Sequence, residues 1–228
     1  MARAAAGTQP GTGRMTGMRL RMWRPRGRAC LSCRQLWNLP PRPAVDQPRE
    51  GSVAGEFDWA PGDWRRDIYE ALRAADVRQV AYVPDAGHAS LIRACHADDA
   101  IRAIVLTTEE EGIGVLAGAH LGGQRGVLLM QSSGVGNCVN TFSLIRNCGF
   151  PMVAIVTMRG EWGEFNPWQV PMGQGTEQAM KDGGFVVHRL ERADEVGPAA
   201  GAALSMAFDG GTPVALLLSQ RLIGAKKF

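Results

Sequence analysis

Cysteine is scarce in this chain, and a secretory signal is missing. The chain has five cysteines, an odd number, and its first 50 residues contain no apolar run long enough for a signal peptide or a membrane helix. These absences exclude a secreted disulfide framework and predict a cytoplasmic protein that does not cross a membrane. Cys30 and Cys33 form a single CxxC pair without the further ligands that a structural zinc site needs. We expect Cys95, Cys138 and Cys148 to pack as small hydrophobic side chains.

Two common nucleotide-binding motifs are missing as well. The sequence has no GxGxxG pattern after a predicted strand and no Gly-Lys-Ser/Thr. An NAD-dependent dehydrogenase is therefore a distant alternative, and a P-loop enzyme is excluded.

Positive charge is confined to the N-terminal part. Residues 1–50 contain ten arginines, one aspartate and one glutamate, a net charge of +8, whereas the whole chain is +3. The remainder therefore carries −5, which argues against nucleic-acid binding by that part. Because the basic segment has no hydrophobic periodicity, we expect residues 1–55 to form a disordered extension. A mitochondrial transit peptide, or a start codon assigned upstream of the true one at Met15, Met18 or Met22, would also explain it.

From Trp59 onward, apolar runs of strand length alternate with segments of helical period. Runs of Val, Ile, Leu and Ala without alternation indicate strands buried on both faces, as in parallel sheets covered by helices. The sequence therefore predicts a three-layer α/β/α domain over residues 56–228 with a mainly parallel sheet of about six strands. The expected strands cover 78–84, 100–107, 126–130, 151–158, 185–190 and 212–220, and the expected helices cover 63–77, 90–99, 108–121, 139–147, 176–184 and 193–208.

The loops that follow strands are where such sheets bind ligands. A histidine in such a loop, here His88, is more often a bystander than a catalyst. Segment 158–175 is long enough for a lid or a binding loop, and its Trp162, Phe165 and Trp168 suggest a partner surface or a closed pocket. The four loops of interest are VPDAGHAS (83–90), TTEEEG (107–112), MQSSGVGN (130–137) and the segment 158–175.

Three consecutive acids open the helix expected at 108–121. Thr108 as N-cap and Glu111 three residues later would form a capping box, and acids in a first turn complement the helix dipole. Consecutive helical residues point about 100° apart. One of Glu109, Glu110 and Glu111 is therefore free to face a ligand while the others cap.

A GxG pair, Gly134 and Gly136, lies where a strand turns into a helix. Glycine lets a ligand approach the bare backbone at such a turn. A tight turn with Ser133 or Asn137 as helix cap explains the same residues equally well.

In combination these loops resemble the pyrimidine-binding domain of thiamine diphosphate enzymes, most closely the α subunit of sulfopyruvate decarboxylase and the matching half of phosphonopyruvate decarboxylase. The similarity runs from about residue 63 to residue 222. It is carried, in order, by VPD (83–85), TEEEGIGVLAGAHL (108–121), LLMQSSGVGN (128–137) and MRGEWGE…PWQVPMGQG (158–175).

The resemblance implies roles for individual residues. In the family, a glutamate at the start of this helix hydrogen-bonds N1′ of the cofactor's aminopyrimidine. Matching Gly118 and His120 to the family's pattern selects Glu109, and a shift of one residue would select Glu110. A carboxyl group in an apolar pocket shares a proton with a ring nitrogen better than a solvated one does. The other cofactor-binding residues implied are Pro84, Gln131, Ser133, Gly134, Val135 and Asn137.

On the substrate side, the resemblance implies Asp85 and His88. Arg159, at the end of a strand, would meet a sulfonate or phosphonate, since a guanidinium pairs with tetrahedral oxyanions. A surface ion pair of Arg159 is the alternative explanation.

The resemblance also implies a partner. Family members hold the diphosphate through Mg²⁺ on a Gly-Asp-Gly…Asn motif in a second domain, and this sequence has no Gly-Asp-Gly. The expected enzyme therefore needs a β subunit that carries Mg²⁺, in an α2β2 or larger assembly. It would decarboxylate 3-sulfopyruvate. The alternatives are phosphonopyruvate or another 2-oxo acid as substrate, or a non-catalytic scaffold that kept the fold.

Overall fold

A six-stranded sheet forms the centre of the computed structural model, which describes residues 57–224. The strand order is β2-β1-β3-β4-β6-β5, and all neighbouring strands are parallel. The predicted parallel α/β fold is confirmed. The predicted extension, residues 1–55, and its CxxC pair lie outside the described residues. The strands are β1 (Val77–Tyr82), β2 (Arg102–Val105), β3 (Arg125–Gln131), β4 (Val153–Thr157), β5 (Val186–Leu190) and β6 (Val214–Leu218).

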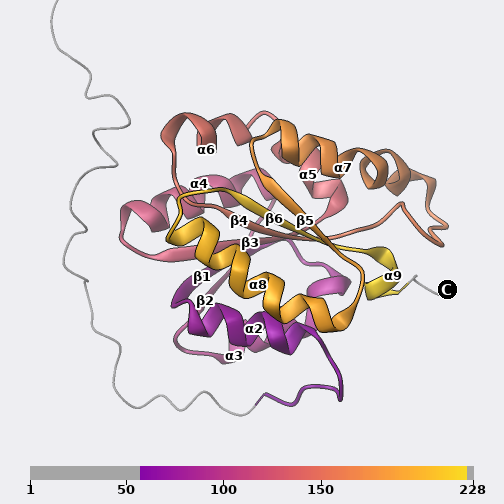
Figure 1. The fold of residues 1–228 in the computed structure, drawn as a ribbon, viewed down its shortest axis with the longest axis horizontal. Helices are drawn as coiled ribbons and strands as arrows, with labels where there is room; N and C mark the ends of the chain where they lie inside the picture. The colour runs from indigo at the N-terminus through magenta and orange to yellow at the C-terminus, as the bar shows by residue number, and fades with distance from the viewer. Residues whose placement is uncertain (1–56, 225–228) are drawn as a thin grey trace, which may run out of the picture. The chain divides into compact units, whose positions relative to one another are not determined.

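Helices cover both faces of this sheet (Figure 1). Because successive strand residues point to opposite faces, Leu128 packs in one apolar core and Leu129 in the other. One face carries α4 (Glu109–Leu121), α5 (Ser132–Cys138), α6 (Phe142–Cys148) and α7 (Val170–Asp182); the other carries α2 (Arg65–Ala74), α3 (Ala89–Ala97) and α8 (Ala193–Phe208). The remaining elements are the 3-10 turns η1 (Ala86–His88) and η2 (Pro167–Gln169) and the short helix α9 (Gln220–Ile223).

Some details of the prediction are wrong. The edge strands β2 and β5 have several exposed residues, because each has a neighbouring strand on one side only. Residues 132–137, expected to be part of a turn, belong to α5, and α7 begins at Val170 rather than at 176. Glycine lowers helix propensity, which hides both helices from the pattern. In α7, Gly173 allows close packing, since a Cβ there would lie 2.2 Å from the carbonyl oxygen of Arg159.

Two of the three cysteines in the described residues are fully buried, as predicted, and Cys148 is partly buried. No helix in the part of the chain that the structure describes has both the length and the apolarity to cross a bilayer.

Candidate functional site

The three glutamates at the start of α4 have different surroundings. The side chain of Glu109 is buried, with 7% of its residue surface exposed, whereas Glu110 and Glu111 are exposed. Glu111 Oε2 accepts a hydrogen bond of 2.9 Å from the backbone N–H of Thr107. The predicted capping box is wrong, because the side chain of Thr108 makes no cap hydrogen bond and Glu111 accepts from the N–H of Thr107 instead of that of the N-cap residue Thr108. Glu109 is thus the acid of this trio that turns inward.

Helix α5 holds the carboxylate of Glu109. Asn137 Nδ2 donates a hydrogen bond of 2.8 Å to Glu109 Oε2. On the other side, a Cβ built at Gly134 would lie 2.3 Å from both Cδ and Oε1 of Glu109. A side chain at position 134 and the observed carboxylate therefore exclude each other. Among the hydrogen bonds of residues 57–224, none reaches Oε1, which leaves this oxygen available to a ligand.

Not all the predicted cofactor-binding residues make contact with this carboxylate. Val135 of α5 is fully buried in the apolar core, and Pro84 is exposed just after β1. Gln131 and Ser133 belong to a neighbouring cluster, where Ser133 Oγ donates to Gln131 Oε1 at 3.0 Å.

This second cluster centres on the partly buried carboxylate of Asp85. Gln131 Nε2 donates to Oδ1 at 3.1 Å, and Thr157 Oγ1 donates to Oδ2 at 2.5 Å. The sequence reasoning missed Thr157. The feature that could have identified Thr157 is its position at the end of β4, directly beside Gln131 at the end of β3.

The prediction that His88 faces the substrate is wrong. Its side chain is fully buried, and Nε2 lies 3.1 Å from the carbonyl oxygen of Ile155, while Nδ1 has no hydrogen-bond partner in the described residues. Burial lowers the pKa of His88, so the imidazole is neutral. A group with no exposed surface cannot touch a substrate.

Arg159 forms a bidentate ion pair with Glu164. Nε lies 2.5 Å from Glu164 Oε2, and Nη2 lies 2.7 Å from Oε1. The pair is not on the open surface, since 12% of the Arg159 side chain and 3% of the Glu164 side chain are exposed. The alternative explanation of Arg159 as an ion-pair residue therefore holds in part. Its Nη1 is not part of this pair.

Arg159 also lines a cavity of about 170 Å³ at the carboxyl ends of the strands. Arg65 contributes a second guanidinium, which stacks over the ring of Trp64 at 4.1 Å. The cavity thus combines two cations with the carboxylate of Asp85. The lining residues are Arg65, Asp85, Ala86, Gly87, Thr157, Arg159, Ile223 and Gly224.

The Arg159–Glu164 pair is expected to make the stability of the fold depend on pH. The hydrogen bonds from Arg159 lower the pKa of Glu164 from its ordinary 4.5 to about 2. A carboxyl group whose pKa is lower in the folded state than in the unfolded state stabilises the fold at pH values above the unfolded-state pKa. This contribution is lost as the pH falls through the folded-state pKa of about 2. It amounts to at most about 3.5 kcal/mol, at roughly 1.4 kcal/mol per pKa unit.

We expect Glu164→Gln to lower the free energy of unfolding near neutral pH. The difference in this free energy between the wild type and the variant should disappear as the pH falls from 4.5 to 2. Urea unfolding at several pH values measures it. Glu70→Gln is the matched control, because Glu70 pairs with Arg66 in the open, with 58% of its side chain exposed. A deficit that stays constant with pH would contradict the assignment.

The segment from 159 to 169 is ordered although it presents three aromatic side chains. Trp162, Phe165 and Trp168 are 49%, 51% and 83% exposed. The buried side chain of Gln220 accepts hydrogen bonds from the backbone N–H groups of Glu161 and Trp162. It also donates a hydrogen bond to the side chain of Glu164. The exposure of the aromatics is therefore not a result of a loose loop, and such residues are typical of a contact surface.

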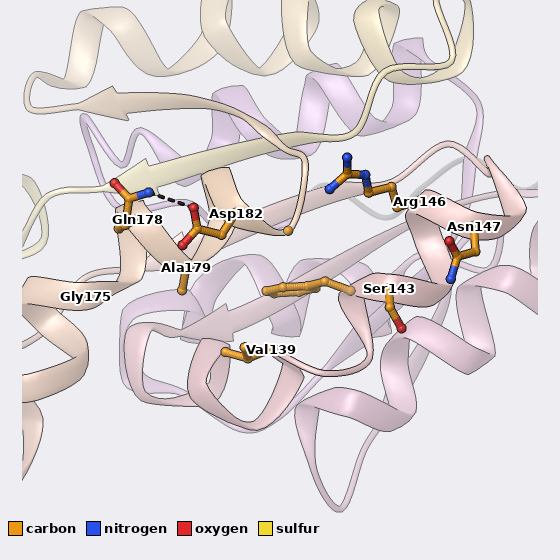
Figure 2. A pocket seen from close by; sticks show the side chains of 10 residues that line it. Val139, Ser143, Arg146, Asn147, Gly175, Gln178, Ala179 and Asp182 are labelled. Carbon is orange, nitrogen blue, oxygen red and sulfur yellow. Dashed lines mark hydrogen bonds between the residues drawn. The ribbon is translucent and has the colours of Figure 1, made fainter. Parts of the chain in front are cut away.

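A larger cavity, of about 810 Å³, lies away from these clusters, between α6 and α7 (Figure 2). It has an apolar floor that includes Val139 and Ala179, and its rim includes Arg146 and Asp182. Asp182 is already engaged by Gln178 at 2.8 Å. None of the predicted site residues lines this cavity. Within residues 57–224, no group of three or more His, Cys, Asp or Glu side chains could hold a metal ion.

Comparison with known proteins gives a consistent result. Residues 63–182 match the family model described as "Thiamine pyrophosphate enzyme, N-terminal TPP binding domain". The sulfopyruvate decarboxylase subunit alpha of Methanococcus maripaludis is 35% identical over 152 residues, which cover 66% of this chain and 91% of that protein. The protein of the same name from Methanothermobacter thermautotrophicus is 39% identical over 115 residues, covering 50% of this chain and 70% of that protein.

Two further likenesses cover parts of longer chains. A phosphonopyruvate decarboxylase of Streptomyces viridochromogenes is 39% identical over 99 residues, 43% of this chain and 25% of that protein. A solved 2-oxoglutarate:ferredoxin oxidoreductase from Magnetococcus marinus superposes with a TM-score of 0.59 at 12% identity, over 70% of this chain and 29% of that chain. At that identity the likeness shows the fold alone.

Proposed function

The chain belongs to the thiamine pyrophosphate enzyme family, and we propose that it is the α subunit of a two-subunit decarboxylase that converts 3-sulfopyruvate to sulfoacetaldehyde and CO₂. The observation that carries this proposal is the inward-turned carboxylate of Glu109. It lies at the start of α4, against bare backbone at Gly134, in a chain whose relatives are named sulfopyruvate decarboxylase subunit alpha.

The residues around Glu109 fit the aminopyrimidine of thiamine diphosphate. A carboxylate that is to face a ring in a closed site needs room beside the backbone and a hydrogen-bond donor. The bare backbone at Gly134 gives Glu109 this room, and the amide of Asn137 donates to Oε2. The ring of bound thiamine diphosphate would lie beside Glu109 Oε1, bordered by Pro84, Gln131, Ser133, Gly134 and Asn137, while the fully buried Val135 would support α5 from the core side.

Thiamine diphosphate, when bound, supplies the electron-accepting heterocycle that decarboxylation of a 2-oxo acid requires. The role of Glu109 is to hold a proton between its Oε1 and the ring nitrogen. Asn137 fixes the other carboxylate oxygen, so that the carboxylate does not need to reorient during turnover. The buried position of Glu109 keeps bulk water from competing for that proton.

We assign the cavity beside Arg159 to the substrate. Glu164 uses Nε and Nη2 of the guanidinium, and Nη1 lies outside that pair. A guanidinium fixed in this way can donate to a tetrahedral oxyanion at little further cost in entropy. Asp85 faces the same cavity and would contact the reacting end of the substrate.

A partner β subunit is proposed to hold the diphosphate and Mg²⁺, in an α2β2 or larger assembly. Two observations support it. Three relatives are named "subunit alpha". The ordered aromatics Trp162, Phe165 and Trp168 are exposed on the segment that begins at the site residue Arg159. We propose that these aromatics pack against the partner.

The experiment that tests this function measures CO₂ release from 3-sulfopyruvate, phosphonopyruvate and pyruvate. The chain is assayed alone and after co-expression with its partner, in the presence of thiamine diphosphate and Mg²⁺. We expect release only from the complex and fastest from 3-sulfopyruvate. Fastest release from phosphonopyruvate would support the second candidate, which the similarity to phosphonopyruvate decarboxylase favours. Release from no substrate would support a scaffold role, and activity of the isolated chain would contradict the two-subunit proposal.

A further inference from the structure

Both oxygens of the Asp85 carboxylate are held by donors from the ends of two adjacent strands. Gln131 is the last residue of β3 and Thr157 the last of β4, and the two are Cα partners in the parallel register. The strand ends therefore present their side chains side by side to Asp85, which follows β1 on the far side of β3 in the sheet order.

The hydroxyl of Thr157 is committed to Asp85. It lies 2.5 Å from Oδ2 of Asp85 but 3.4 Å from the carbonyl oxygen of Met130, its other acceptor. A threonine hydroxyl has a single proton, which goes to the nearer, charged acceptor. Thr157 also lines the cavity of about 170 Å³, but only 1% of the residue is exposed, so its side chain has almost no surface with which to touch a substrate.

Tight packing fixes the pair. A Cβ at Gly87 would lie 2.6 Å from Thr157 Cγ2 and 2.9 Å from Asp85 Oδ2. The backbone of η1 therefore closes over both groups, and the carboxylate has no room to turn away from Thr157 on that side. Asp85 nevertheless borders the cavity of about 170 Å³ that Arg159 also lines.

We propose that Thr157 is a positioning residue, whose hydroxyl holds the Asp85 carboxylate in the orientation that faces the cavity and its substrate. This inference rests on the proposed function, because it takes Asp85 as a substrate-facing group. Thr157 acts through Asp85 and not on the substrate itself.

The test compares Thr157→Val with Thr157→Ser in the complex of the chain with its partner. Valine keeps the shape and removes the hydroxyl, whereas serine keeps the hydroxyl and loses the methyl group. Losing a hydrogen bond to a charged group corresponds to roughly a 10- to 100-fold change. We expect kcat/KM to fall by that factor in T157V and to stay within about threefold of the wild type in T157S. In the Asp85→Asn background, T157V should have almost no further effect.

Equal losses in T157V and T157S would overturn the proposal, as would an unchanged T157V or an effect that adds fully to that of D85N. Crystal structures of both variants supply a readout that does not need activity. The Asp85 carboxylate should be displaced in T157V and unmoved in T157S, and an unmoved carboxylate in T157V would also overturn the proposal. If the wild-type complex releases no CO₂, the proposed function fails, and these carboxylate positions still test the role of Thr157.

Discussion

Replacing Glu109 by Gln is expected to reduce turnover of the assembled enzyme by about 10²- to 10⁴-fold, the range found for positioned acid–base groups. Glutamine keeps the size of the side chain and can still bond to Asn137, but it cannot carry a proton to or from a ring nitrogen. The fold should be little affected, because no buried ion pair is broken. Steady-state CO₂ release and thermal unfolding of the variant measure the two effects separately.

Glu110→Gln is the matched control for this experiment. Glu110 is adjacent in sequence and exposed, so its variant should keep near-normal turnover. This control also decides the one-residue ambiguity in the sequence matching. A severe loss in E110Q with normal activity in E109Q would transfer the role to Glu110, and normal activity in both would favour the scaffold explanation.

Gly134→Ala is expected to reduce turnover strongly while changing stability little. The new Cβ would lie 2.3 Å from Glu109 Cδ and Oε1, so one of the two groups must move. The end of a flexible side chain moves more easily than backbone, and the carboxylate of Glu109 will therefore be displaced. A misplacement of about 1 Å can cost roughly 10²-fold in rate. Turnover and the midpoint of thermal unfolding are measured together.

Gly118→Ala is the control for the change from glycine to alanine. A Cβ at Gly118 meets nothing within 4 Å, so this variant should keep its turnover. It should also gain about 0.5–1 kcal/mol of stability, because alanine is the better helix former. If G134A is as active as G118A, the carboxylate of Glu109 does not need the position that the structure gives it.

The layered fold could be predicted from the sequence because the patterns that indicate it are local. Continuous apolar runs mark β3, β4 and β6, and α8 occupies the predicted residues 193–208. The helices that escaped prediction are those in which glycine serves packing. Gly134 and Gly173 lower local helix propensity, but each makes room for a neighbouring group that a Cβ would displace.

The candidate site likewise contains residues that a single segment predicts and residues that only the tertiary structure reveals. Glu109 follows from the acids at a helix start and from the family resemblance, both of which are read along a single segment. The bond between Thr157 and Asp85 joins residues 72 positions apart and depends on the order β1-β3-β4, which no local pattern contains. The burial of His88 is likewise a tertiary property, which the sequence around the residue does not indicate.

A crystal structure of the chain with its partner and thiamine diphosphate tests the central claim most directly. The account predicts Glu109 Oε1 at about 2.6–3.2 Å from N1′ of the aminopyrimidine, the range for hydrogen-bonded acid–base groups. A ring that binds elsewhere, or a Glu109 carboxylate that points into solvent while the ring is in place, would contradict it.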